Sequence, residues 1–389
     1  MLTKEENELL TRVGPGTPCG ELLRRYWHPV AIAHELTPER PTKFVRLLGE
    51  DLVLFLDKSG RAGLLGDHCP HRSASLVYGR VEERGIACAY HGWLMDTCGN
   101  ILETPPERNE AIMHSVQQRA YPVRRFIGMY WAYLGPEPAP EIPRYDVWAR
   151  KDGYRKIVVH PELACNWLQP MENSVDPAHL QVLHQEFIGG KRTPVSTTRG
   201  YTDDVESFDF WIADTGTFMK RRVYKTGYVE EHPVLFPNIL RQGNNTQIRV
   251  PIDDTHTAHI FVGLELTPDG SIPDQPEDPP VEYLQPYKEP ADATHPEARY
   301  LMNSVLAQDH AMWETQGPIT DRSVEHLSYS DRGVALFRKL LRENIQKVQR
   351  GEDPLGTVRD PNHDIIDTNL EAAKREGVAS RGEMAAARA

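Results

Sequence analysis

Two short segments of this chain each place one cysteine close to one histidine. The first contains Cys69 and His71 in the order Cys-x-His, and the second contains Cys88 and His91 in the order Cys-x-x-His. Sixteen residues separate the two segments. Thiolate and imidazole are both metal ligands, so a chain that uses all four must bring two loops together around one centre.

The order of these ligands favours an iron–sulfur cluster over zinc. Zinc fingers usually pair Cys with Cys and His with His, whereas here each loop supplies one of each, with the cysteine first. This arrangement suits a Rieske-type 2Fe-2S cluster, in which two thiolates hold one iron and two imidazoles hold the other. Tetrahedral zinc is the alternative on residue types alone.

A second candidate metal site lies in "NWLQPMENSVDPAHLQVLHQE", residues 166–186, which we expect to be helical. His179 and His184 differ by about 140° around a regular helix, so they do not share one face. For both to bind one metal, the helix must bend, bulge or end between them. Asp176 can orient a ligand imidazole, or can cap a helix that begins at Pro177. The alternative is two unrelated histidines on an amphipathic helix.

Two histidines and one carboxylate form the facial triad of non-haem iron sites. The segment "LAQDHAMWE" supplies Asp309 from a helical run that is otherwise apolar on one face. On sequence alone, Glu314, Asp321 and Asp331 compete with it.

The remaining pattern indicates two domains. Short strands and tight turns are typical of 41–145, whereas helices and longer strands alternate over 146–375. Residues 1–40 are expected to form short helices that pack on the second domain, and 376–389 a tail that frays. Within the second domain we expect strands at 200–211, 217–227, 234–241, 246–252 and 256–266, and helices over 298–350.

Composition excludes several classes of protein. A net charge of -12 and a pI of about 5.8 argue against nucleic acid as the main partner. The apolar runs are too short to span a bilayer, and no signal peptide is evident. Five cysteines in 389 residues do not form a disulfide framework, so a cytoplasmic location is expected.

Taken together, the two motifs resemble those of the terminal oxygenase (alpha) subunits of Rieske non-haem iron aromatic ring-hydroxylating oxygenases. Within this family the chain is similar to the phthalate dioxygenase branch, which also contains aromatic O-demethylases. The resemblance extends to "QIRVPIDDTHT" and "QDHAMWETQGPITDRSVEHLSYSD". It implies an α+β fold: an all-β Rieske 2Fe-2S domain, and a helix-grip catalytic domain in which an antiparallel sheet wraps a long helix.

The resemblance also implies the cofactors and their ligands. Mononuclear Fe(II) would be bound by His179, His184 and Asp309. Asp176 would connect that iron to a cluster histidine, His71, of a neighbouring subunit in a homotrimer, and Asn173 would lie near the iron. The 2Fe-2S cluster would be bound by Cys69, His71, Cys88 and His91.

The implied activity is hydroxylation of an aromatic compound with O2, and we expect an aromatic carboxylate. Electrons would come from a separate NAD(P)H-dependent reductase bearing flavin and a ferredoxin cluster, because this chain has neither a plant-type cysteine motif nor a nucleotide fingerprint. O-demethylation of a methoxylated lignin-type acid is one alternative. A non-catalytic Rieske electron carrier is an alternative of another class.

An aromatic acid requires a cation in an otherwise apolar pocket. The candidates are Arg241 and Arg249, with Lys220 and Arg221 behind them. Strand alternation places Arg249 on the same face as Gln247. Solvent-exposed strand positions are an equally good interpretation of these cations.

Overall fold

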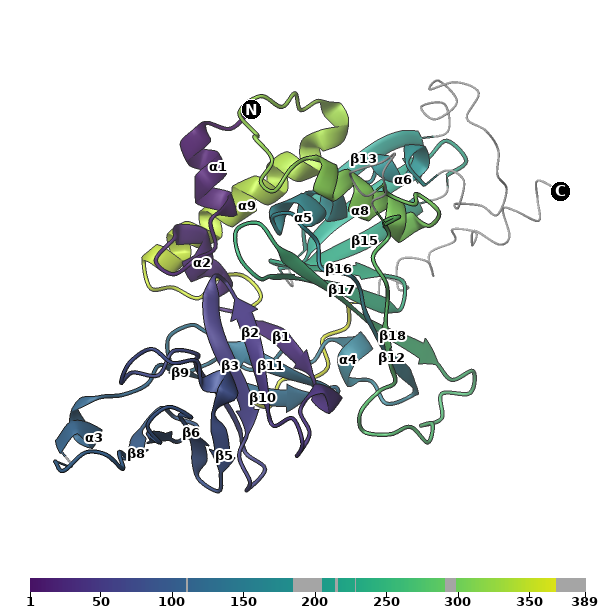
Figure 1. Ribbon diagram of the computed structural model, residues 1–389. Helices are drawn as coiled ribbons and strands as arrows, with labels where there is room; N and C mark the ends of the chain where they lie inside the picture. Colours follow the sequence, from purple (N-terminus) through teal and green to yellow (C-terminus); the bar gives the residue numbers. More distant parts are fainter. Residues whose placement is uncertain (110, 185–204, 214–215, 228, 291–298, 369–389) are drawn as a thin grey trace. The chain divides into compact units, whose positions relative to one another are not determined.

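The computed structural model of the chain describes residues 1–109, 111–184, 205–213, 216–227, 229–290 and 299–368. The chain divides into two compact units (Figure 1). The large unit comprises Met1–Arg12, Pro143–Asp274 and Pro280–Ala389, and the small unit comprises Val13–Ile142 and Gln275–Pro279.

The small unit is built from short antiparallel strands. Its three sheets have the strand orders β1-β11-β10, β2-β3-β4-β9 and β5-β6-β7-β8. The strands are β1 (Trp27–Ile32), β2 (Thr42–Leu47), β3 (Glu50–Leu56), β4 (Ala62–Gly66), β5 (Arg80–Glu82), β6 (Gly85–Ala87), β7 (Leu94–Met95), β8 (Ile101–Glu103), β9 (Ala120–Tyr121), β10 (Val123–Phe126) and β11 (Met129–Tyr133). Short helices are α2 (Pro18–Leu23), η1 (Ala33–Glu35), η2 (Leu76–Tyr78) and α3 (Ala111–Ser115).

Tight turns make these short strands possible. Leu48 and Gly49 join β2 to β3 with φ of 50° and 72°, the pair of positive values that a two-residue hairpin requires. The strands then bury one apolar cluster that includes Phe55, Leu65 and Trp93.

One eight-stranded sheet dominates the large unit. Its order is β13-β14-β15-β16-β17-β18-β12-β19, and all neighbours are antiparallel except β12 and β19. The strands are β12 (Gly153–Val159), β13 (Val205–Ile212), β14 (Phe218–Tyr224), β15 (Val229–Leu235), β16 (Ile239–Gln242), β17 (Asn245–Pro251), β18 (Thr257–Leu266) and β19 (Val281–Tyr283). The helices are α1 (Lys4–Thr11), α4 (Asp146–Ala149), α5 (Leu168–Val175), α6 (His179–Val182), α8 (Val305–Thr315), η3 (Tyr329–Asp331) and α9 (Arg332–Gln349).

Helix α9 is the long helix of this unit, and its sequence explains its position. Buried side chains recur every three or four residues, which gives it one apolar stripe: Val334, Phe337, Leu341, Ile345 and Val348. It packs against α1, α5 and β13. A mostly antiparallel sheet with a long helix in one unit, together with small β-sheets in the other, confirms the predicted α+β class.

A glycine sets the contact between α9 and the end of α5. A Cβ on Gly333 would lie 2.6 Å from the carbonyl oxygen of Val175 and 2.4 Å from the ring of Phe210. Any larger residue would therefore push away the C-terminus of α5, which leads directly into Asp176.

Several boundaries differ from the sequence-based prediction. Residues 1–40 do not form one helical segment, because only 1–12 belong to the large unit and β1 pairs with β11 in the small unit. The predicted strand 234–241 spans the end of β15, a turn and most of β16. The predicted helix 166–186 is broken after Val175. The predicted tail, 376–389, lies outside the described residues.

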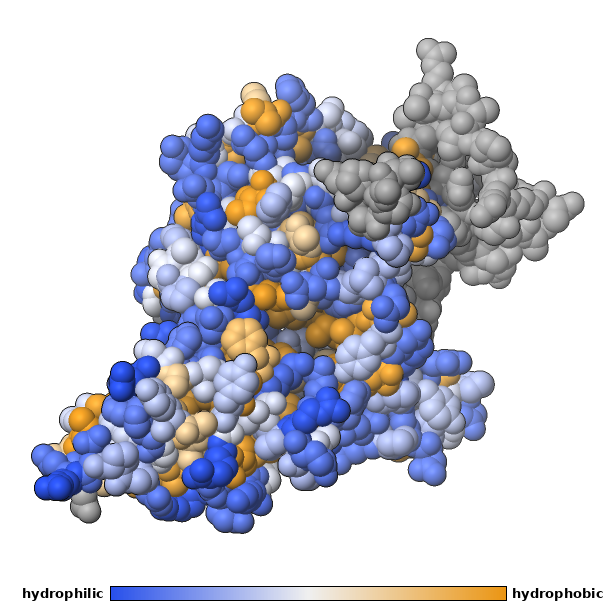
Figure 2. Space-filling model, viewed as in Figure 1, coloured by the Kyte–Doolittle hydropathy of each residue, from blue (hydrophilic) through white to orange (hydrophobic). Residues whose placement is uncertain are grey.

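Within the described part of the chain, no helix is both long and apolar enough to cross a membrane. The face of the molecule shown in Figure 2 is mostly hydrophilic, with apolar side chains gathered in limited areas.

Candidate metal centres and active site

The two Cys-His loops of the small unit have the same backbone design. In the first, the N–H of Ser73 donates to the carbonyl of Cys69 (2.8 Å); in the second, the N–H of Gly92 donates to the carbonyl of Cys88 (2.9 Å). Ser73 and Gly92 occupy equivalent places and both have positive φ, 58° and 75°. Each loop is thus a tight turn that presents its cysteine and histidine on the same side.

The four side chains meet in a way that fits a 2Fe-2S cluster. The two thiols are close enough to share a hydrogen bond, and the rings of His71 and His91 lie 4.6 Å apart between centroids. Burial and the neighbouring Cys88 raise the pKa of Cys69 to about 11. Thiolates are the ligand form, so binding of iron by these cysteines would have to offset this shift. Two thiols and two imidazoles are the donor set of a Rieske centre.

In the large unit, the helical segment is interrupted between α5 and α6, and the second candidate site lies at this interruption. Asp176 ends α5 with extended φ and ψ, and its Oδ1 accepts a hydrogen bond from the N–H of Ala178 (2.7 Å). Helix α6 then ends at Val182, before His184. The break that the five-residue spacing of His179 and His184 requires is therefore present. Asp176 also approaches His179, with 3.3 Å between Oδ2 and Nδ1, a contact that suits the predicted orienting role. The predicted N-cap role is corrected, because helix α6 begins at His179 and its N-cap is Ala178.

His179 on α6, His184 just after it and Asp309 on α8 converge. The Oδ1 atom of Asp309, on α8, lies 3.0 Å from Nε2 of His184 and 3.8 Å from Nε2 of His179. One ligand atom from each of the three residues lies within 4.8 Å of the others. Two neutral nitrogen donors and one carboxylate are the donor set of a facial triad, so these residues fit a mononuclear iron.

His184 and Asp309 also have hydrogen-bond partners outside this group of three residues. Nδ1 of His184 lies 2.9 Å from Oε1 of Gln308, and Nδ2 of Asn173 lies 3.4 Å from Oδ1 of Asp309. Burial lowers the pKa of His184, but the hydrogen bonds with Asp309 and Gln308 outweigh it and raise the pKa above its usual value. Burial raises the pKa of Asp176, and the hydrogen bond and charge of His179 reverse this, so the net shift is downward. The lowered pKa of Asp176 favours its anionic form beside the imidazole of His179.

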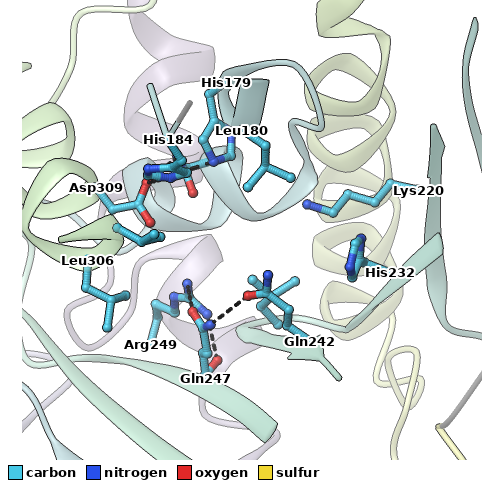
Figure 3. Close-up of a pocket in the computed structure, with 13 residues that line it drawn as sticks. His179, Leu180, His184, Lys220, His232, Gln242, Gln247, Arg249, Leu306 and Asp309 are labelled. Carbon is cyan, nitrogen blue, oxygen red and sulfur yellow. Dashed lines mark hydrogen bonds and ion pairs between the residues drawn. The ribbon is translucent and has the colours of Figure 1, made fainter. Parts of the chain in front are cut away.

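A pocket opens at these three residues. Figure 3 shows His179, His184 and Asp309 along one wall, with polar side chains of the sheet facing them. The apolar part of the lining is Leu180, Leu240, Val305 and Leu306; the polar part from the sheet is Lys220, His232, Gln242, Gln247 and Arg249.

The sheet places the predicted cations differently from one another. Arg249 lines the pocket beside Gln247, as strand alternation predicts, and its Nη2 donates to Oε1 of Gln247 (2.7 Å). Arg241 does not line this pocket: alternation along β16 turns it to the other face, where its Nη2 lies 2.9 Å from Oδ2 of Asp146. The prediction that Arg241 is a substrate ligand is therefore corrected. Arg221 pairs with Glu231 across the hairpin.

Lys220 enters the pocket more directly than the sequence indicated. Its side chain is 4% exposed, and the ammonium has no hydrogen-bond partner among the residues that the structure describes. Burial lowers its pKa from 10.5 to about 8, partly offset by Asp176 and Asp309. In the sequence, Lys220 is followed directly by Arg221 and Arg222, so residue type alone does not single it out.

The three competing carboxylates are occupied elsewhere. Glu314 lies at the far end of α8, where it pairs with Lys288 (2.5 Å) and accepts from the N–H of Ala164 (2.7 Å). Asp321 is exposed and accepts from Ser323, and Asp331 accepts from the N–H of Ser328.

The sequence did not reveal a second group of histidines. It comes from the end of β12, from β18 and from α8. His160, His259 and His310 are buried, and Nδ1 of His259 lies 3.1 Å from Nε2 of His310. The rings of His160 and His259 are stacked 4.7 Å apart, so their in-plane lone pairs run side by side instead of meeting at one ion. Burial lowers the pKa of His160 to about 4 and of His310 to about 3. We interpret this group as a neutral packing cluster.

Two family models match parts of this chain. Residues 26–122 match the family model of the Rieske [2Fe-2S] domain, and residues 301–372 match the model described as LigXa C-terminal domain like. The 5,5'-dehydrodivanillate O-demethylase oxygenase subunit of Sphingobium sp. (strain NBRC 103272 / SYK-6) is 40% identical over 372 residues, which cover 93% of this chain and 84% of that protein. This chain belongs to the oxygenase subunits of the Rieske oxygenase family.

Other Rieske oxygenases extend the comparison. The phthalate 4,5-dioxygenase oxygenase subunit of Pseudomonas putida is 35% identical, with 92% of this chain and 89% of that protein covered. The solved structure of Pseudomonas putida CBB5 NdmA has the same fold, with a TM-score of 0.61 at 20% identity over 89% of this chain and 99% of that one.

Membership settles the class of the protein and its cofactors. The chain is an enzyme, the oxygenase component of a multicomponent Rieske oxygenase, and not a non-catalytic electron carrier. Its cofactors are a Rieske 2Fe-2S cluster and a mononuclear iron, for which the two groups of donors described above are suited.

Proposed function

We propose that this Rieske oxygenase subunit oxidises an aromatic carboxylate in the pocket beside His179, His184 and Asp309. The observation that carries the proposal is that these three metal donors share one pocket with the buried ammonium of Lys220. In the same proposal, the cluster is held by Cys69, His71, Cys88 and His91.

The chain's own residues bind and orient the substrate. Iron with three protein ligands supplies open positions for O2, and the cluster supplies single electrons. Leu180, Leu240 and Leu306 offer apolar contact to an aromatic ring and exclude water. Gln247 fixes the Arg249 guanidinium, which leaves Lys220 as the charged group best able to meet a carboxylate.

Lys220 has an alternative role as a counter-ion for Asp176 and Asp309, whose charges act to raise its pKa. A bound ferrous ion, however, compensates the charge of both carboxylates. The ammonium then has an unbalanced positive charge in a buried pocket, and an anionic substrate would balance it. This argument favours a carboxylate substrate over a neutral arene.

The names of the relatives support the same substrate class. They include subunits acting on phthalate, phenoxybenzoate and 3-chlorobenzoate, and the 40%-identical relative is named as a demethylase of 5,5'-dehydrodivanillate. Ring dioxygenation of an aromatic acid is therefore our first candidate reaction, and O-demethylation of a methoxylated aromatic acid is the second. Formaldehyde release during turnover would identify the second, and a cis-dihydrodiol the first.

Replacing Lys220 by Met is expected to lower kcat/KM for an aromatic carboxylate by roughly 30- to 4,000-fold, the equivalent of about 2–5 kcal/mol for truncating one side of a buried charge pair. The corresponding uncharged methyl ester should change little. Steady-state kinetics with both substrates would measure the difference, and Lys225→Met, exposed in the following turn, is the matched control. Equal losses for acid and ester would contradict the carboxylate proposal.

The pH dependence should have the sign that a protonated lysine gives. Because the pKa of Lys220 is lowered to about 8, the ammonium is present below that pH and is lost above it. The substrate carboxylate is ionised throughout, so kcat/KM should be level below the pKa and fall by about tenfold per pH unit above it. This fall in kcat/KM at high pH should be absent in Lys220→Met. A wild-type profile that is level to pH 10 would count against Lys220 as the anchor.

We also propose the assembly and the partners. Asp176 would receive a hydrogen bond from His71 of the partner subunit within a homotrimer; its side chain is 23% exposed, so the carboxylate can take a further donor. Electrons would come from a separate NAD(P)H-dependent flavin and ferredoxin reductase. A cytoplasmic location is supported by five cysteines that are all free of disulfides.

A further inference from the structure

The proposed iron ligands have different outer partners. Nδ1 of His179 faces a carboxylate, Asp176, whereas Nδ1 of His184 faces a neutral amide, Oε1 of Gln308, at 2.9 Å. His184 is fully buried and Gln308 is 6% exposed, so water does not replace this contact easily. Nothing in the sequence motif pointed to Gln308, which simply precedes Asp309 on α8.

We propose that Gln308 is a positioning residue that fixes the tautomer and the ring orientation of His184 for metal binding. The inference rests on the proposed iron site. A metal takes the lone pair of Nε2, the atom that faces Asp309, and the proton of a neutral imidazole must then reside on Nδ1. A proton on Nδ1 needs an acceptor, and the amide oxygen of Gln308 is that acceptor.

The position of Gln308 on α8 holds its contact with His184 in a fixed geometry. Gln308 and Asp309 are consecutive residues of one helix, and they contact the two nitrogens of the same imidazole, Nδ1 at 2.9 Å and Nε2 at 3.0 Å. The ring of His184 is therefore clamped between neighbouring side chains of a single element. Any shift of α8 moves the metal-binding carboxylate and the tautomer-fixing amide together.

The neutrality of Gln308 is also functional in this proposal. Asp176 and Asp309 carry two negative charges, which balance a ferrous ion. A glutamate at 308 would supply the same acceptor but a third negative charge, which stabilises Fe(III) relative to Fe(II) and makes His184 a stronger donor. The amide thus orients the ligand without lowering the potential of the iron.

Two substitutions separate hydrogen bonding from packing. Gln308→Met keeps the length and bulk of the side chain but offers only a weak sulfur acceptor, whereas Gln308→Glu keeps the oxygen acceptor. After selective removal of the mononuclear iron, anaerobic Fe(II) titration against a competing chelator should show about 10- to 100-fold weaker binding for Gln308→Met, the range for loss of an outer-ligand partner. Gln308→Glu should bind at least as tightly as wild type, with a lower Fe(III)/Fe(II) midpoint potential.

Controls on the same protein make each outcome decisive. Gln316→Met, at the exposed end of α8, should bind Fe(II) as wild type does. Cluster absorbance and thermal unfolding should be unchanged in all variants, and the Co(II) spectrum of Gln308→Met should be altered if the ring of His184 rotates. Wild-type Fe(II) affinity in a folded Gln308→Met would overturn the inference, and so would equal weakening in the Met and Glu variants, which indicates packing.

His184→Ala distinguishes this failure from failure of the iron site itself. If His184→Ala still binds Fe(II) with wild-type affinity, the proposed ligand set is wrong. If His184→Ala loses the iron while Gln308→Met retains it, the ligand set stands and only the role of Gln308 is refuted.

Discussion

Asp309→Ala should leave a red-brown protein that has lost its mononuclear iron and its turnover. Removing the one anionic donor leaves two neutral imidazoles, and the loss in affinity should exceed the roughly 10- to 100-fold effect of removing an outer partner. Wild-type protein should contain about three iron atoms and about two acid-labile sulfides per chain. The variant should contain about two of each, with the cluster absorption intact.

Glu314→Gln provides the matched control for this result. Glu314 lies on the same helix as Asp309 but is committed to Lys288 and Tyr300. Its substitution should reduce stability without changing the iron content. Full iron and full turnover in Asp309→Ala would refute the assignment, and a wild-type protein that cannot be loaded beyond two irons would refute the mononuclear site.

Co-expression of two inactive variants should restore activity if electrons cross between subunits. Cys88→Ser should lose the cluster, and His179→Ala should lose the mononuclear iron, so neither homotrimer turns over. In a mixed trimer, some chains place an intact cluster beside the intact iron of a neighbour. The proposed bridge through Asp176 supplies the short path that electron transfer needs, and product formation by purified mixed trimers would measure it.

The bridge itself is tested by a third change. Adding Asp176→Asn to the chain with intact iron keeps the shape of the side chain but removes the charge that accepts hydrogen bonds from two imidazoles. Recovery should disappear while both metals remain bound. Verified mixed trimers that stay inactive, with each variant folded and retaining its remaining metal, would exclude transfer between subunits.

The sequence alone was sufficient for the cluster loops. Two cysteines and two histidines within 23 residues can meet only if both loops turn tightly, and the paired hydrogen bonds at Ser73 and Gly92 show that local backbone geometry does this. Asp176 followed by Pro177 indicated a helix start at this point, although α6 begins only at His179. Such features depend on neighbours in the chain, so spacing and residue type carry the information.

The iron site and its pocket depended on contacts between distant segments. Asp309 lies 125 residues from His184, and the sequence could not separate it from Glu314 because both are acids on one helix. Only the packing of α8 against α5 turns Asp309 and Gln308 toward the histidines and Glu314 toward Lys288. In the same way, only the paired strands decide that Lys220 and Arg249 enter the pocket while Arg241 faces Asp146. Strand alternation says which residues share a face, but the layer packed on the sheet decides which face is the inside.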